Sequence, residues 1–94
     1  KPIGYSLSKF GLIGLTKYLA TYWGHLGVRC NALALGAVKN KQSNYLIKNI
    51  IKRVPLKRLA TIDEYKKTLH YMCTDASSYM TGETVIIDGG RSTW

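Results

Sequence analysis

The 94-residue sequence suits one domain with a modest core, since a chain of this size buries about 60 to 65% of the surface exposed when unfolded. Its composition is that of a globular protein and excludes a membrane helix, because no apolar run approaches the roughly 18 residues that a span needs. The net charge of +9 is uneven, with all 5 acidic residues beyond residue 62, so residues 1–62 should attract anions such as a phosphate-bearing cofactor, an anionic substrate or nucleic acid.

The first predicted element is a long helix from Ser6 to about Tyr22. Apolar residues recur at helical spacing along one face, and others occupy further faces. A helix that is apolar on most faces is typically buried on more than one side. We therefore expect a sheet on one flank and another helix or subunit on the other.

Tyr5 and Lys9 stand at the start of this helix, four residues apart. Side chains at this spacing project side by side on one helical face. A nearby cation and the positive end of a helix dipole both favour a phenolate and lower the pKa of the phenol. The pair is a candidate proton-transfer device, and the alternative is a solvated surface pair.

A short apolar run, 28–35, follows a turn at Gly27 and predicts a buried strand. Gly36 comes directly after it, where the backbone can approach a ligand closely. Open α/β sheets bind ligands at the carboxyl ends of their parallel strands. We therefore expect a ligand site at Gly36.

Residues 39–58 contain seven of the basic residues and a short amphipathic helix that ends before Pro55. The functional interpretation is a mobile lid over the ligand site, and the alternative is an ordinary connecting helix. The positive charge, which includes Lys39 and Lys41, favours an anionic substrate such as a phosphorylated or nucleotide-linked sugar.

The last third predicts a helix and then a strand. Thr61 and Glu64 form a capping-box pattern that starts a helix reaching about Cys73. A β-branched run, 84–88, predicts a strand that ends at Gly89 and Gly90. The order is helix, strand, helix, helix, strand, which is typical of an α/β fold with a parallel sheet.

The cysteines and histidines show no metal-ligand spacing, so we predict no metal site. Cys30 and Cys73 are expected to be buried free thiols, which fits a reducing cytoplasm.

Five blocks of sequence, in order along nearly the whole chain, resemble the C-terminal half of short-chain dehydrogenases/reductases. They are Tyr5-x-x-x-Lys9, Gly27-Val28-Arg29-Cys30-Asn31-Ala32, Val54-Pro55-Leu56-x-Arg58, Asp75-Ala-Ser-Ser-Tyr79-Met-Thr81-Gly82 and Asp88-Gly89-Gly90. The resemblance implies a Rossmann-like, doubly wound parallel sheet. It also implies an oxidoreductase that binds NAD or NADP and interconverts a small-molecule alcohol and a carbonyl.

The same resemblance assigns site residues. Tyr5 would be the catalytic acid/base, and Lys9 would hold the nicotinamide ribose and lower the pKa of the tyrosine. The loop after the strand usually reads Pro-Gly-x-Ile/Val-x-Thr in the family, so Gly36, Val38 and Asn40 would contact the nicotinamide side of the cofactor. Leu35 replaces the proline and Asn40 the threonine, which bears on the rigidity of this turn.

The family's Gly-rich phosphate loop and catalytic serine precede the tyrosine and do not occur in these residues. We therefore expect residues 1–94 to be the C-terminal part of a single Rossmann-like domain and to be inactive by themselves. The family's use of the helix after the tyrosine as a subunit contact implies a homodimer or homotetramer.

Two other interpretations compete with the enzyme. One is a truncated product that keeps only an oligomerisation surface. The other is a nucleic-acid-binding module, which the scattered positions of the basic residues disfavour.

Overall fold

The computed structural model describes residues 2–94 and contains the five predicted elements in the predicted order. Three short 3₁₀ turns join or follow them. The helices and strands are α1 (Ile3–Trp23), β1 (Ala32–Leu35), α2 (Asn44–Ile51), α3 (Ile62–Cys73) and β2 (Thr84–Ile87).

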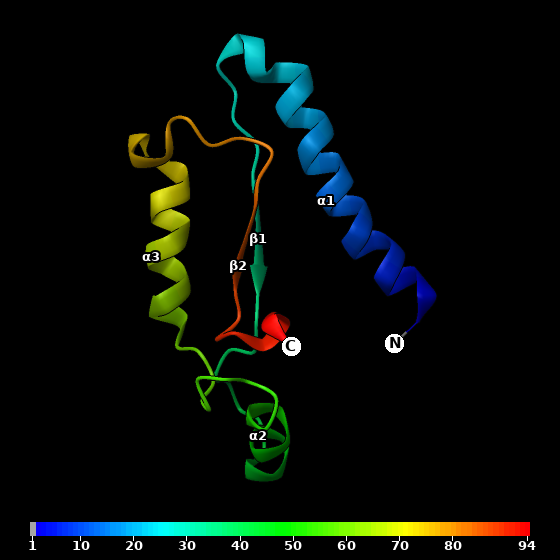
Figure 1. Ribbon diagram of the computed structural model, residues 1–94, viewed down its shortest axis with the longest axis vertical. Helices are drawn as coiled ribbons and strands as arrows, with labels where there is room; N and C mark the ends of the chain where they lie inside the picture. Colours follow the sequence, from blue (N-terminus) through cyan, green and yellow to red (C-terminus); the bar gives the residue numbers. More distant parts are fainter. Residues whose placement is uncertain (1) are drawn as a thin grey trace.

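The two strands form a parallel pair in which Ala32 lies opposite Thr84 and Leu35 opposite Ile87. In Figure 1 this pair stands between α3 on one side and α1 on the other. Helices on both sides of parallel strands are the arrangement of a doubly wound α/β fold, so the predicted fold class is confirmed for this part of the sheet.

The first strand is shorter and less buried than predicted. Only residues 32–35 pair with β2, and Leu35 is 50% exposed. The preceding residues make individual contacts instead: Cys30 donates its N–H to the Thr81 hydroxyl, and its carbonyl accepts the N–H of Gly82 at 2.7 Å. Cys73, predicted to be buried, is exposed at the last position of α3, whereas Cys30 is half-buried.

Two of the sequence blocks contact each other where the two strands begin. The guanidinium of Arg29 donates to the carbonyls of Met72, Thr74 and Met80. Asn31 donates to the Met80 carbonyl at 2.9 Å and accepts the N–H of Glu83 at 3.1 Å. These bonds satisfy carbonyls at the end of α3 and fix the turn that leads into β2.

Two further blocks pack together at the opposite end of the sheet. Gly89 and Gly90 have φ angles of +64° and +90°, and an added Cβ would come within 2.8 Å of the Val54 and Pro55 side chains respectively. Leu56 donates its N–H to the Gly89 carbonyl at 3.2 Å. Only glycine combines this left-handed backbone with such close packing, which explains the Gly-Gly pair.

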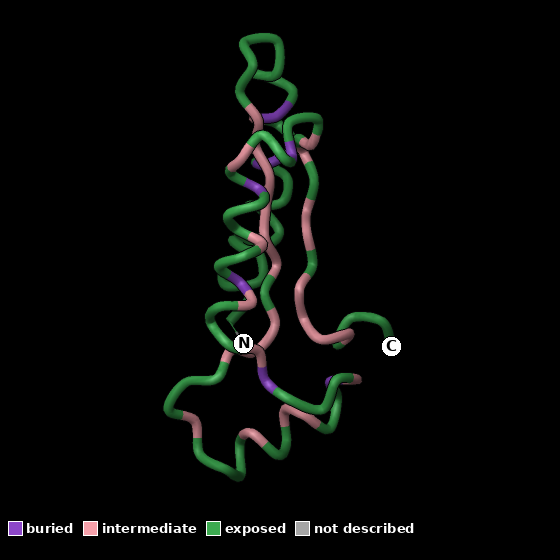
Figure 2. Tube along the Cα trace, turned by 90° about the vertical axis from the view of Figure 1, so that its left-hand side faces the viewer, coloured by how far each residue is buried: buried purple, intermediate pink, exposed green. Residues whose placement is uncertain are grey.

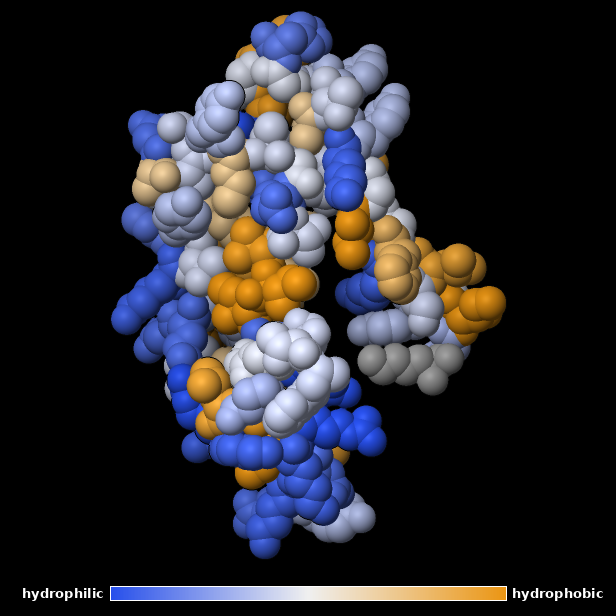
Figure 3. All heavy atoms as spheres, viewed as in Figure 1, coloured by the Kyte–Doolittle hydropathy of each residue, from blue (hydrophilic) through white to orange (hydrophobic). Residues whose placement is uncertain are grey.

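Few side chains are enclosed, as the sparse buried positions in Figure 2 show. Along α1, only Thr16 and Ala20 are buried, while Phe10 is 75% exposed. The radius of gyration is 15.5 Å, compared with about 13 Å for a compact domain of 100 residues. The burial expected for α1 on more than one side is therefore not supplied by residues 2–94, and much of its apolar surface is open (Figure 3). None of the described helices is long and apolar enough to cross a membrane.

Candidate functional site

Tyr5 and Lys9 lie together on α1 and face the sheet. Tyr5 is the third residue of the helix, and the Lys9 ammonium is 5.5 Å from the centroid of the Tyr5 ring. Both side chains line a cavity of about 620 Å³ between α1 and β1, which we call the α1 cavity. Its other lining residues are Leu12, Ile13, Thr16, Asn31, Ala32, Leu33, Ala34, Leu35 and Thr84.

The residues that line the α1 cavity have the chemistry of a site for an organic ring. Its walls are mostly apolar, and its polar groups are few: a phenol, an ammonium, an amide and two hydroxyls. Figure 3 shows a hollow between α1 and the rest of the molecule. A half-exposed phenol with a cation beside it can exchange a proton with a bound oxygen atom.

Gly36 lies at the end of β1 and lines a second cavity. It donates its N–H to the Ile87 carbonyl at 2.8 Å, which extends the β1–β2 pairing by one residue. A second cavity of about 610 Å³, which we call the α2 cavity, is lined by Gly36, Ala37, Asn49, Ile50, Lys52, Arg53, Val54, Asp88 and Arg91. Leu35 lines the α1 cavity and the next residue, Gly36, lines the α2 cavity, so consecutive residues at the carboxyl end of β1 take part in the two cavities.

Val38 and Asn40 line neither of these two cavities. Val38 forms a parallel bridge with Ala60, and its carbonyl accepts the side-chain amide of Gln42 at 2.8 Å. The N–H of Asn40 donates to the oxygen of the same side chain at 2.6 Å. Gln42, which the sequence did not single out, therefore holds both ends of this short loop.

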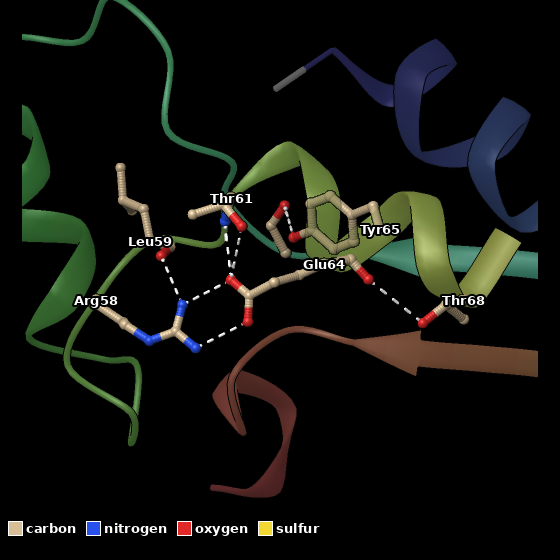
Figure 4. A network of polar contacts seen from close by, with 7 residues as sticks. Arg58, Leu59, Thr61, Glu64, Tyr65 and Thr68 are labelled. Atoms are coloured by element: carbon tan, nitrogen blue, oxygen red, sulfur yellow. Dashed lines mark hydrogen bonds and ion pairs between the residues drawn. The ribbon is translucent and has the colours of Figure 1, made fainter.

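Tyr65 is a second residue that sequence reasoning missed. It lies on α3, is 4% exposed, and donates its hydroxyl to the Gly36 carbonyl at 3.0 Å (Figure 4). Burial raises the pKa of Tyr65, so the phenol keeps the proton that it donates. The bond ties the ligand-site loop to α3 and fixes the orientation of the Gly36 peptide.

We expect Tyr65→Phe to destabilise the complete polypeptide that carries these residues by about 1 to 3 kcal/mol, because the Gly36 carbonyl loses its side-chain donor. Urea unfolding measures this effect. Tyr71→Phe is the matched control, since Tyr71 lies on the same helix and is 46% exposed. Equal unfolding free energies for the two variants would contradict a structural role for the Tyr65 hydroxyl.

Arg58 and Glu64 anchor the beginning of α3, next to Tyr65 (Figure 4). The guanidinium donates to both carboxylate oxygens of Glu64, at 2.7 and 2.8 Å, and Glu64 also accepts the N–H of Thr61 at 2.9 Å. The predicted capping box is therefore confirmed. The hydrogen bonds from Arg58, followed by that from Thr61, lower the pKa of Glu64 to about 2.

This pKa predicts an acid-sensitive helix terminus. A carboxylate whose folded-state pKa is lowered stabilises the fold above its unfolded pKa of about 4.3, and this contribution is lost as the pH falls toward 2. We expect Glu64→Gln to lower stability at neutral pH and to weaken the loss of stability between about pH 4.3 and 2. Circular dichroism during acid titration tests this, with Asp63→Asn as the exposed neighbouring control. Identical acid transitions in the wild type and Glu64→Gln would refute the prediction.

Comparisons with known proteins place the whole chain in one group of enzymes. A family model described as enoyl-(acyl carrier protein) reductase matches residues 2–92. An uncharacterised short-chain type dehydrogenase/reductase of Sinorhizobium fredii is 37% identical over 97 residues, covering 96% of this chain and 18% of the relative.

Two solved structures have the same fold over 96% of this chain. One is 4-hydroxyisoleucine dehydrogenase complexed with NADH, at 26% identity and a TM-score of 0.90, covering 40% of that protein. The other is a putative 2-deoxy-D-gluconate 3-dehydrogenase of Agrobacterium tumefaciens with bound NADP, at 28% identity and a TM-score of 0.87, covering 39% of that protein. The chain thus spans well under half of the length of these relatives.

Proposed function

Because the chain belongs to the short-chain dehydrogenase/reductase family, we propose that it contributes the proton-transfer half of an active site that interconverts an alcohol and a carbonyl. The observation that carries this proposal is the placement of Tyr5 and Lys9 together on the wall of the α1 cavity, beside β1. The cofactor is NAD or NADP, as in the two dehydrogenases solved with NADH and NADP.

Tyr5 acts as the acid/base. In carbonyl reduction its hydroxyl donates a proton to the oxygen as the carbon receives hydride, which avoids a free alkoxide; in alcohol oxidation the proton moves in the opposite direction. The nicotinamide, when bound, supplies or accepts the hydride. Lys9, whose ammonium lies 5.5 Å from the centre of the Tyr5 ring, would hold the nicotinamide ribose by donating hydrogen bonds to it.

The α1 cavity fits such a cofactor in its chemistry. Its apolar wall along β1 suits the flat face of a nicotinamide ring, and Lys9 provides a donor for ribose hydroxyls. Gly36, Val38 and Asn40 are proposed to present backbone groups and a side-chain amide to the nicotinamide side. The bonds from Tyr65 to Gly36 and from Gln42 to Val38 support this role, because they fix the loop without using the Asn40 side chain.

Residues 39–58 are proposed to cover the substrate. Their base is held where Lys39 donates its N–H to the Ala60 carbonyl at 2.8 Å and Ala60 donates to Ala37 at 3.0 Å. The end of the segment is also tied to the turn after β2, where Leu56 donates its N–H to the Gly89 carbonyl. The part that can move is therefore the excursion through α2, which projects beyond the end of the sheet in Figure 1.

The proposal is tested by assaying the complete polypeptide for carbonyl reduction with NADH and with NADPH, followed by the absorbance of the reduced nicotinamide. Turnover with either cofactor supports the proposal. A complete polypeptide that binds neither cofactor would instead favour the non-catalytic oligomerisation product.

Two further properties stay predictions: residues 1–94 alone should show no turnover, and the complete polypeptide should be a homodimer or homotetramer. The open apolar surface of α1 supports the second, and light scattering tests it.

A further inference from the structure

The α2 cavity concentrates positive charge beside the proposed reaction site. Lys52, Arg53 and Arg91 contribute three cations to its lining, against the single carboxylate of Asp88. The cations come from two segments that are distant in the sequence: the end of α2 and the turn after β2. The fold therefore brings them together around one space.

None of these three cations forms an ion pair with a residue that the structure describes. Among residues 2–94, the ion pairs within 4.0 Å join Arg58 to Glu64 and Lys66 to Asp63, and neither involves the α2 cavity. Cations gathered around a concave surface without acidic partners favour an anionic ligand.

The Asp88 carboxylate is directed to its own turn. Its two oxygens accept the backbone N–H groups of Gly90 and Ser92 at 2.9 and 3.0 Å. Hydrogen bonds from Ser92, with that from Gly90, lower the pKa of Asp88, so the group is ionised and occupied in shaping the wall. It offsets only part of the positive charge.

The two walls that carry the cations are joined to each other. The indole N–H of Trp94 donates to the Arg53 carbonyl at 3.0 Å, and the Lys57 ammonium is 5.8 Å from the centroid of the Trp94 ring. Together with the bond from Leu56 to Gly89, these contacts hold the end of α2 against the turn after β2. The two segments that carry the positive charges are therefore held together around one cavity.

We propose that the α2 cavity binds an oxyanion, a carboxylate or a phosphate, at the end of the substrate that is remote from the reacting carbon. This inference rests on the proposed function. Leu35 and Gly36 are consecutive residues that line the α1 and α2 cavities respectively, so the proposal places the reacting carbon beside Tyr5 and the anionic end of the same molecule beside the cations. Ile50 and Val54 provide an apolar wall for the carbon chain between its two ends.

The cations that line the α2 cavity are not the lysines that the sequence analysis associated with an anionic substrate. Lys39 and Lys41 do not line the α2 cavity; they lie in the loop that the Val38–Ala60 bridge and the Gln42 side chain hold. Arg91, which lies far from the basic segment in the sequence, takes part instead.

The test is calorimetric titration of the complete polypeptide, without nicotinamide, with succinate, inorganic phosphate and the neutral analogue succinamide. We expect the anions to bind and succinamide not to bind. Arg53→Gln and Arg91→Gln should each weaken anion binding about tenfold, the size of one charge-assisted hydrogen bond. Arg53→Gln keeps the backbone carbonyl that Trp94 uses.

Lys48→Gln is the matched control, since it also removes one positive charge but Lys48 lies on α2 and does not line the cavity. It should change the anion affinity by less than about twofold. Lys52→Gln replaces either arginine variant if that variant does not fold by circular dichroism. If phosphate binds more tightly than succinate, the anionic end of the substrate is a phosphate ester. If succinate binds more tightly, the anionic end is a carboxylate. Equal binding of succinate and succinamide, or equal weakening by Lys48→Gln and the arginine variants, overturns the proposal.

The outcomes separate this inference from the proposed function. Turnover of a neutral ketone that succinate does not inhibit would overturn the anion site and leave the oxidoreductase intact. Charge-selective binding of succinate with no turnover on any carbonyl would support the anion site and refute the oxidoreductase.

Discussion

Tyr5→Phe is expected to lower kcat of the complete polypeptide by about 10²- to 10⁴-fold, the contribution of a well-placed general acid. The substitution removes the phenol hydroxyl that α1 presents near Lys9 and keeps the ring that the Lys9 ammonium faces. The helix and the cavity wall should therefore persist, and the loss should fall on the proton-transfer step rather than on cofactor binding.

The measurement is steady-state kinetics combined with the dissociation constant of the reduced cofactor. Tyr18→Phe is the control, because Tyr18 lies on the same helix, is 61% exposed and stacks on Tyr22 instead of lining the α1 cavity. A Tyr5→Phe variant that retains wild-type kcat would remove Tyr5 from the chemistry.

The sequence predicts local relationships well, and the Tyr5–Lys9 pair illustrates why. Two side chains four apart on a helix must share a face, so their proximity depends only on helix formation. The Thr61–Glu64 capping box forms for the same reason. These features need no knowledge of the tertiary fold.

Contacts between residues that are distant in the sequence cannot be predicted in this way. The bond from Tyr65 to Gly36 joins residues 29 positions apart, and nothing in the local pattern around Tyr65 distinguishes a buried hydroxyl from an ordinary apolar helix position. The sequence order of the five blocks gave no indication that Arg29 and Asn31 would bind the carbonyls before β2. Their partners are backbone groups, which carry no signature in the residue types.

The sequence also does not predict how exposed α1 is. Periodicity shows that the helix is apolar on most faces, but it does not say which surfaces cover them. Among the residues of α1 only Thr16 and Ala20 are buried, and the sheet beside them has two strands in the described part of the chain. The apolar pattern indicates that several faces of α1 are buried, but residues 2–94 cover only part of this apolar surface.

Gly36→Ala is expected to destabilise the fold by about 1 to 3 kcal/mol and to raise KM for the cofactor. A Cβ at this position would lie 2.7 Å from the Asp88 Cα and 2.9 Å from its Cβ. A main-chain atom cannot rotate away as a flexible side chain can, so the ends of β1 and β2 would have to separate. That movement would strain the bond from the Gly36 N–H to the Ile87 carbonyl and displace the loop that carries Val38.

Gly24→Ala provides the matched control for the free energy of unfolding. Gly24 has helical angles, φ −57° and ψ −39°, and no described atom lies within 4 Å of an added Cβ. The same methyl group should therefore be neutral there or stabilise the helix end by up to about 1 kcal/mol. If urea unfolding gave equal free energies for the two variants, close contact between Gly36 and Asp88 could not be what fixes the loop. If Gly36→Ala lost stability but kept the cofactor KM, the loop would be a structural joint rather than part of the cofactor site.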